Sequence, residues 1–189
     1  MAALNFAPEV LLKAQGSGLG LRAALFDVDG VLTDGRLYIG EHGETVKAFS
    51  VLDGQGLKLL AAGGILPLIV TGRDSPAVRR RVADLGLPHA VYGAQDKRAA
   101  ADALLVSLQL EWTDVAVMGD DWPDLPLMAQ AAFSCAPANA HAEVRAVADH
   151  VTQARGGEGA ARECCDLLLM SAGRYATLLR GHQTTLDRS

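Results

Sequence analysis

Short apolar runs alternate with longer amphipathic runs along most of this chain. The apolar runs are typical of buried strands, which we expect at residues 23–26, 65–70, 90–92, 115–118 and 132–136. The amphipathic runs predict helices at residues 54–62, 75–85, 97–110, 124–130 and 141–148. Strands that are regularly separated by helices form right-handed βαβ units. The pattern therefore predicts an α/β, Rossmann-like fold, in which a mostly parallel sheet has helices on both faces.

Residues 36–49 depart from this alternation. They contain two short apolar runs around Gly40-Glu41-His42-Gly43, which indicates a β-hairpin inserted after the first strand. The hairpin is too short to be a separate domain. Because two strands alone are marginal in water, we expect it to pack against a partner surface rather than to stand as a free surface ribbon.

The chain length favours one domain, which we place at residues 21–172. Residues 1–20 combine a short helical pattern with the glycine cluster Gly16-Ser17-Gly18, and we interpret them as an N-terminal appendage. Residues 173–189 are polar and lack apolar periodicity, so we expect a frayed C-terminal tail.

Composition and charge exclude several classes of protein. The net charge is -5 and no dense Lys/Arg run is present, which argues against a nucleic-acid partner. The three cysteines have no C-x-x-C spacing, and the five histidines are scattered, so neither a disulfide framework nor a zinc site is indicated. No apolar run reaches the roughly 18 residues of a membrane span, and the N-terminus lacks a basic stretch followed by an apolar one. We therefore expect no membrane contact and a cytoplasmic location.

Polar residues whose side chains could act in catalysis or metal binding directly follow three of the predicted strands. They are Asp27 and Asp29 after the first, Thr71, Gly72 and Arg73 after the second, and Asp120, Asp121 and Asp124 after the fourth. The carboxyl ends of parallel strands meet at one edge of a sheet, where ligands bind in α/β folds. Lys97 opens the helix that follows the third strand, and it adds a cation beside the same edge.

Each of these features taken alone has a plainer interpretation. Asp27-x-Asp29 could stabilise a turn, the acids of residues 120–124 could cap a helix, and Lys97 could be a solvated lysine. Together they suggest a Mg²⁺ site, because Mg²⁺ prefers hard oxygen ligands, and Asp27 and Asp120 can supply two carboxylates. Thr71 lies near a helix start at Ser75-Pro76, which suits a phosphoryl oxygen.

The motifs also occur in a familiar order. Asp-x-Asp-Gly-x-x-x-Asp at 27–34, Thr-Gly-Arg at 71–73, Lys97 and Gly-Asp-Asp-x-x-Asp at 119–124 resemble the four motifs of the haloacid dehalogenase-like phosphatases. The Gly54-x-Gly56 turn, Gly93-x-x-x-Lys97 and the segment 155–166 resemble a subgroup that acts on an eight-carbon sugar acid phosphate and has no separate cap domain. This resemblance covers about residues 21–170.

The resemblance implies covalent catalysis. Asp27 would attack phosphorus to form an aspartyl-phosphate, and Asp29 would protonate the leaving alcohol and then activate water. Thr71 and Lys97 would hold the transferring phosphoryl oxygens. Carboxylate nucleophiles and general acid–base groups both suit such a two-step displacement.

The resemblance also implies a Mg²⁺ cofactor. The carboxylates of Asp27 and Asp120 and the backbone carbonyl of Asp29 would hold the metal, while Asp121 and Asp124 would orient the metal shell or Lys97. The cation would reduce the repulsion between an anionic nucleophile and an anionic ester.

Ten residues match the family's contacts to its sugar acid: Asp29, Ser50, Val51, Leu52, Asp53, Gly54, Lys58, Arg73, Arg81 and Lys97. Bidentate Arg suits a carboxylate. Relatives often have Arg at the positions of Leu52 and Lys58. The substrate therefore stays open between 3-deoxy-D-manno-octulosonate 8-phosphate, used in lipopolysaccharide sugar biosynthesis, and another acidic sugar phosphate such as a nine-carbon 9-phosphate.

The resemblance also implies a homotetramer, in which hairpins and tails from neighbouring subunits close each active site. The hairpin and the Gly-rich segment 155–159 fit that arrangement, although the segment could also be a plain loop before a helix at 160–170.

Two functions from other classes remain as alternatives. A phospho-Asp receiver domain also gathers Asp, Thr and Lys around Mg²⁺, but there the acidic pair comes first in the chain, whereas here the second acidic cluster comes last. A non-catalytic module is disfavoured because Asp27, Asp29, Thr71, Lys97 and Asp120 are all intact.

Overall fold

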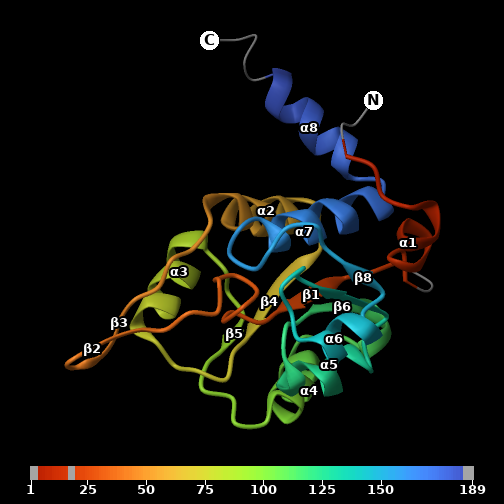
Figure 1. Ribbon diagram of the computed structural model, residues 1–189. Coiled ribbons are helices and arrows are strands. Elements are labelled where there is room, and N and C mark those ends of the chain that lie inside the picture. The colour runs from red at the N-terminus through yellow and green to blue at the C-terminus, as the bar shows by residue number, and fades with distance from the viewer. Residues whose placement is uncertain (1–3, 17–19, 185–189) are drawn as a thin grey trace.

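The computed structural model describes residues 4–16 and 20–184, and its centre is a parallel sheet in the order β5-β4-β1-β6-β7-β8 (Figure 1). The strands are β1 (Ala23–Phe26), β4 (Leu66–Val70), β5 (Ala90–Val91), β6 (Val115–Met118), β7 (Phe133–Ala136) and β8 (His150–Val151). This arrangement confirms the predicted α/β fold. The sequence did not predict β8, because His150 and Val151 stand between Asp149 and Thr152 and form no apolar run, unlike the equally short β5.

Helices cover both faces of the sheet (Figure 1). They are α1 (Pro8–Lys13), α2 (Val51–Ala62), α3 (Pro76–Leu85), α4 (Lys97–Ser107), α5 (Leu125–Met128), α6 (Ala142–Val147), α7 (Ala160–Ser171) and α8 (Tyr175–Thr184). Helices α2, α3 and α7 pack on one face, and α4, α5 and α6 pack on the other. Short 3₁₀ turns at Trp112–Asp114 and Trp122–Asp124 flank β6.

Strand β1 shows why the strands read as continuous apolar runs. Ala24 and Phe26 belong to the core under α2, α3 and α7, whereas Ala23 and Leu25 belong to the core under α4, α5 and α6. All four side chains are buried, because a parallel strand inside a doubly covered sheet has no solvent-facing side.

The predicted hairpin is present as β2 (Tyr38–Gly40) and β3 (Gly43–Val46), and it extends away from the body of the protein (Figure 1). Gly43 has a φ of +105°, which a residue with a side chain rarely adopts, so the turn depends on this glycine. The apolar side chains of Leu37, Tyr38, Ile39 and Val46 are exposed on it.

Helix α2 begins at Val51, earlier than predicted, because the Ser50 side chain caps it by accepting a hydrogen bond from the Leu52 backbone N–H. The prediction of a turn at Gly54-x-Gly56 is therefore wrong, since both glycines lie inside this helix. They are needed for packing rather than for a turn. A Cβ on Gly54 would lie 2.3 Å from Arg81 Nη2, and one on Gly56 would lie 3.0 Å from the Arg162 Cα atom in α7.

The terminal segments are more ordered than predicted over the described residues. Val10 and Leu11 of α1 pack against the core, as do Tyr175 and Leu178 of α8. The prediction that this segment lacks apolar periodicity is wrong, because Tyr175 and Leu178 recur at helical spacing on one face. Residues 175–184 therefore form a helix instead of a frayed tail. Residues 1–3, 17–19 and 185–189 lie outside the described part of the chain, and so does most of the Gly16-Ser17-Gly18 cluster.

Two further observations concern the described residues. The cysteines Cys135, Cys164 and Cys165 are free thiols in the core. Across residues 4–16 and 20–184, the helices are all too short or too polar to cross a lipid bilayer.

Candidate active site

The functional residues gather at the carboxyl end of β1, between its two neighbours β4 and β6. Asp27 directly follows β1, Thr71 follows β4, and Asp120 comes two residues after β6. Phe26 pairs with Ile69 on one side and with Met118 on the other, so these strand ends lie level. The chain changes direction across the sheet between β1 and β6, which is where ligands bind in open α/β sheets.

The loop after β1 is closed by the hydroxyl of Thr33. This oxygen accepts hydrogen bonds from the backbone N–H groups of Gly30, at 3.3 Å, and Gly35, at 3.2 Å. Gly30 has a φ of +93°, and a Cβ there would lie 2.0 Å from Asp120 Oδ2. Glycine is therefore required at position 30 both for the backbone conformation and for the approach of the Asp120 carboxylate.

Lys97 is buried between two carboxylates. Its Nζ lies 2.8 Å from Asp27 Oδ1 and 2.7 Å from Asp124 Oδ1, and its side chain is only 8% exposed. Burial acts to lower the pKa of Lys97, but Asp27 and Asp124 outweigh it and raise that pKa above its usual value. Lys97 is therefore a fixed positive charge beside Asp27, and not the solvated lysine of the plainer interpretation.

Asp124 holds the turn after β6. Its Oδ2 accepts hydrogen bonds from the backbone N–H groups of Asp120, at 3.1 Å, and Asp121, at 3.4 Å. Its Oδ1 contacts Lys97, so both oxygens already have partners in the chain. A Cβ on Gly119 would lie 2.3 Å from the Asp124 Cβ, so this glycine makes room for it. Asp124 is thus both a helix-capping residue and the orienting partner of Lys97, whereas Asp121 is exposed.

The carboxylates of Asp27, Asp120 and Asp124 offer oxygen atoms within 4.8 Å of one another. Burial, with the charge of Asp124 added, raises the pKa of Asp27 to about 6, although Lys97 opposes the rise. Burial and the charges of Asp27 and Asp124 raise the pKa of Asp120 to about 8. This excess of negative charge fits a hard divalent cation. Because Asp124 is already occupied, Asp27 and Asp120 are the carboxylates available to hold one.

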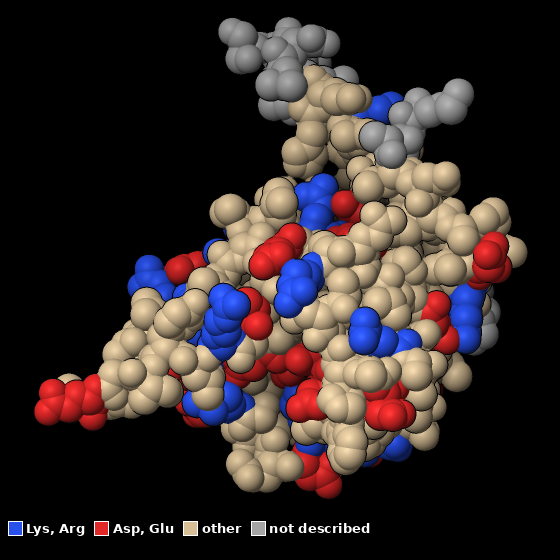
Figure 2. Space-filling model, in the orientation of Figure 1, with Lys and Arg blue, Asp and Glu red and all other residues tan. Residues whose placement is uncertain are grey.

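A cavity of about 530 Å³ opens over these groups. Its lining contains Asp27, Asp29, Gly35, Leu37, Thr71, Gly72, Arg73, Ala94, Gln95, Lys97, Asp120, Asp121, Pro123 and Asp124. Figure 2 shows acidic side chains gathered in a hollow beside the base of the hairpin, with basic side chains along its rim. The structure therefore brings all of the predicted catalytic and metal-binding residues to one site.

Two charged residues of this site were not predicted from the sequence. Lys47, just after β3, forms an ion pair with Asp29, and its Nζ lies 3.3 Å from Glu44 Oε1. Burial acts to raise the pKa of Glu44, but the Lys47 ammonium and its other partners outweigh it and lower that pKa. Nothing in the hairpin sequence marks this lysine as buried, because the contact depends on where the end of β3 lies against the β1 loop.

Most of the predicted substrate contacts lie outside this cavity of their own chain: Ser50, Val51, Leu52, Asp53, Gly54, Lys58 and Arg81. Val51 and Leu52 are exposed at the start of α2, and so is Lys58. Arg81 of α3 donates a hydrogen bond from Nη2 to the Ser50 carbonyl oxygen at 3.0 Å. Of the predicted set, Asp29, Arg73 and Lys97 line the cavity.

Asp53 is buried, and its carboxylate faces the start of α7. Oδ1 accepts a hydrogen bond from the Arg162 N–H at 2.8 Å, and Oδ2 accepts one from the Gly159 N–H at 3.2 Å. Burial raises the pKa of Asp53, although these backbone N–H groups oppose the rise. In this chain the Asp53 carboxylate caps the N-terminus of α7, because Gly159, at the N-cap position, has no side chain that could do so.

The Gly-rich segment 155–159 lies against the β1 loop of its own chain. The Gly157 N–H donates to the Val31 carbonyl oxygen at 3.0 Å, and a Cβ on Gly156 would lie 1.7 Å from the Gly30 carbonyl oxygen. The segment therefore lies beside the loop that carries Asp27 and Asp29, and its expected part in closing a neighbour's site stays a prediction. The absence of side chains lets the two backbones meet within one chain.

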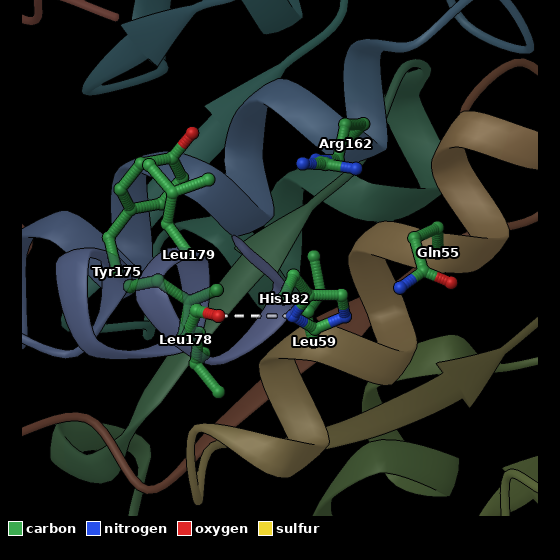
Figure 3. A pocket seen from close by; sticks show the side chains of 8 residues that line it. Gln55, Leu59, Arg162, Tyr175, Leu178, Leu179 and His182 are labelled. Carbon is green, nitrogen blue, oxygen red and sulfur yellow. Dashed lines mark hydrogen bonds between the residues drawn. The ribbon is translucent and has the colours of Figure 1, made fainter. Parts of the chain in front are cut away.

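A second cavity, of about 220 Å³, lies between α2, α7 and α8 (Figure 3). Its lining consists of Gln55, Leu59, Arg162, Leu169, Tyr175, Leu178, Leu179 and His182. It has no carboxylate and is mostly apolar, so the chemistry expected of this protein belongs to the cavity at the end of β1.

Comparisons with known proteins point to the same chemistry. A family model of haloacid dehalogenase-like hydrolases matches residues 91–163. The chain is 42% identical to the 3-deoxy-D-manno-octulosonate 8-phosphate phosphatase KdsC of Salmonella typhimurium over 167 residues, which cover 88% of this chain and 87% of that protein.

Solved structures agree. The 3-deoxy-D-manno-octulosonate 8-phosphate phosphatase of Yersinia pestis matches with a TM-score of 0.85 and 40% identity, covering 90% of each chain. The enzyme of that name from Moraxella catarrhalis, solved with magnesium, phosphate and KDO, matches with a TM-score of 0.86 and 37% identity, over 92% of this chain and 98% of that one. The chain therefore belongs to the haloacid dehalogenase-like phosphatases, and within them to the family of the 3-deoxy-D-manno-octulosonate 8-phosphate phosphatases.

Proposed function

We propose that this protein hydrolyses 3-deoxy-D-manno-octulosonate 8-phosphate to the sugar acid and phosphate, in lipopolysaccharide sugar biosynthesis. The observation that carries the proposal is the position of Asp27, at the end of the central strand, 2.8 Å from the buried Lys97 and beside Asp120. The relatives of this chain, at 42% and 40% identity, carry the name of that activity.

In the first step, an oxygen of Asp27 attacks phosphorus, and the bond from phosphorus to the sugar oxygen breaks. The leaving oxygen takes the electron pair of that bond and a proton from the carboxyl group of Asp29. In the second step, Asp29 takes a proton from water, the water oxygen attacks phosphorus, and the bond to Asp27 breaks. Covalent catalysis of this kind replaces one difficult displacement with two easier ones.

Lys97 and Thr71 line the cavity beside Asp27, and we assign them to the transferring phosphoryl group. The ammonium of Lys97 is held by Asp124, so it is already oriented when the anionic substrate arrives. Mg²⁺, held by the carboxylates of Asp27 and Asp120 and the backbone carbonyl of Asp29, would supply charge neutralisation between the nucleophile and the ester. Asp121 would orient the metal shell.

We propose a homotetramer in which a neighbour supplies the remaining contacts to the sugar acid. Two features support this assembly: the exposed apolar side chains of the hairpin, and the position of Val51, Leu52 and Lys58, which are exposed and lie outside the cavity of their own chain. Light scattering should give four times the 19.8 kDa of one chain. A monomer at assay concentrations would contradict the assembly.

The substrate and the mechanism can be tested in one steady-state panel. The panel compares octulosonate 8-phosphate, a nine-carbon sugar acid 9-phosphate and glucose 6-phosphate, each with MgCl₂ and with EDTA. We expect the eight-carbon ester to be preferred, activity to need Mg²⁺, and Asp27→Asn to lower kcat at least about 1,000-fold. Asp84→Asn, an exposed carboxylate paired with Arg80, is the matched control and should change little.

The outcomes separate the two claims. Equal rates with glucose 6-phosphate would show that the assigned substrate is wrong, and preference for the nine-carbon ester would favour the alternative sugar acid. Full activity of Asp27→Asn would exclude the aspartyl-phosphate mechanism.

A further inference from the structure

Two lysines, Lys97 and Lys47, each form ion pairs with different carboxylates of the active site. Lys97 contacts Asp27 and Asp124 from the α4 side. Lys47 contacts Asp29 from the hairpin side, and its side chain is only 1% exposed. The nucleophile and the residue two positions after it therefore each have a buried ammonium of their own, and these two cations come from different elements of the fold.

The position of Lys47 is fixed by a second carboxylate. Its Nζ lies 3.3 Å from Glu44 Oε1. Glu44 also accepts a hydrogen bond from the Ser75 hydroxyl at 3.2 Å and from Arg73 Nη2 at 3.3 Å, both from the segment between β4 and α3. The hairpin is thereby tied to the neighbouring strand end, and the Lys47 ammonium is held at one place.

The two carboxylate oxygens of Asp29 have different surroundings. Oδ1 takes the contact with Lys47. Oδ2 has no hydrogen-bond partner among the described residues, and Arg73 Nε lies 3.9 Å from it, which is beyond hydrogen-bond distance. The Asp29 side chain is half-buried, and with one anchored oxygen and one unpartnered oxygen it has a defined orientation and one oxygen left for exchange with another group.

We propose that Lys47 is the positioning residue of Asp29, a role that rests on the function proposed above. Its ammonium holds Asp29 Oδ1, so that Oδ2 is the oxygen that donates the proton to the leaving alcohol and later receives one from water. Without this cation, Asp29 Oδ1 would lose its anchor, and the half-exposed Arg73, 3.9 Å from Asp29 Oδ2 and 3.3 Å from Glu44 Oε2, would be left as the shared counter-ion of the two carboxylates. Asp29 would then no longer be held towards the reacting oxygen.

The test uses two phosphate esters with different leaving groups in Lys47→Met. An alkyl alcohol must be protonated as it leaves, whereas p-nitrophenolate departs without a proton. We expect kcat for the sugar acid phosphate to fall about 100-fold, with KM changed less than about threefold. The single-turnover release of p-nitrophenolate should fall less than about tenfold.

Two further variants separate positioning from folding. Lys47→Arg keeps a cation and should recover kcat for the alkyl ester to within about tenfold of the wild type. Lys13→Met removes an ion-paired lysine on the far helix α1, and it should leave both rates unchanged. Circular dichroism should show that Lys47→Met keeps the wild-type secondary structure.

The outcomes that overturn the proposal are specific. Equal losses for both esters in Lys47→Met, no recovery in Lys47→Arg, or unchanged turnover of the alkyl ester would each do so. If the wild type prefers a different alkyl phosphate, only the assigned substrate fails, and the comparison is made with that ester. If the wild type hydrolyses no phosphate ester, the proposed function and the role of Lys47 fail together.

Discussion

The acidic cluster of Asp27, Asp120 and Asp124 should make the effect of Mg²⁺ on stability depend on pH. Without a metal, the pKa of Asp120 is raised from 3.8 to about 8 by burial and by the charges of Asp27 and Asp124. The folded protein then holds this proton more tightly than the unfolded chain does. The resulting stability is complete below the unfolded pKa near 4, and it is lost as the pH rises towards about 8. A divalent cation that replaces the proton should restore this stability.

The magnitude follows from the fraction of Asp120 that is free of a proton. This fraction is about one half near pH 8 and about one hundredth near pH 6, so deprotonation of Asp120 alone should make Mg²⁺ binding on the order of 50-fold tighter at the higher pH. Asp27, whose pKa is raised to about 6, adds to the difference in the same direction. With Mg²⁺ well above its Kd, that ratio is worth about 2 kcal/mol of folding free energy. For a chain of this length, the Mg²⁺-induced rise in Tm should then be about 4–8 °C larger near pH 8 than near pH 6.

The assay is differential scanning calorimetry in MgCl₂ and in EDTA at the two pH values. Asp120→Asn is the control, because it removes both the titrating group and the proposed metal ligand, and its Tm should respond little to Mg²⁺ at either pH. An equal rise in Tm at both pH values, or a larger rise near pH 6, would refute the reasoning.

Two further predictions concern helix α7. Asp53→Ala leaves the buried N–H groups of Gly159 and Arg162 without an acceptor. In urea titrations it should lower the free energy of unfolding by about 1–3 kcal/mol, with a smaller loss for Asp53→Asn. An unchanged free energy of unfolding in Asp53→Ala would mean that the cap contributes nothing. Gly56→Ala should lower the free energy of unfolding by about 1–2 kcal/mol, because its Cβ would crowd Arg162. Gly181→Ala in α8, where a Cβ meets no atom within 4 Å, should not lower it. Equal effects of the two substitutions would contradict the packing argument.

The order of elements and the main chemical groups followed from the sequence for a physical reason. Strands buried on both faces appear as short apolar runs, and residues that directly follow parallel strands must meet at one edge of the sheet. Asp27, Thr71 and Asp120 could therefore be assigned to one site before their distances were known. The plainer interpretation of the acidic turn also proved partly right, since Asp124 does cap it.

Contacts between distant segments were decided only by the tertiary structure. Lys47 directly follows β3, and its burial against Asp29 depends on where the end of that strand lies against the β1 loop. Asp53 was assigned to the substrate by resemblance, yet its carboxylate caps a helix more than one hundred residues further along the chain. Periodicity and motif order report local conformation and strand ends. They do not specify which side chain fills a space that two remote segments enclose, because that depends on the packing of the whole fold.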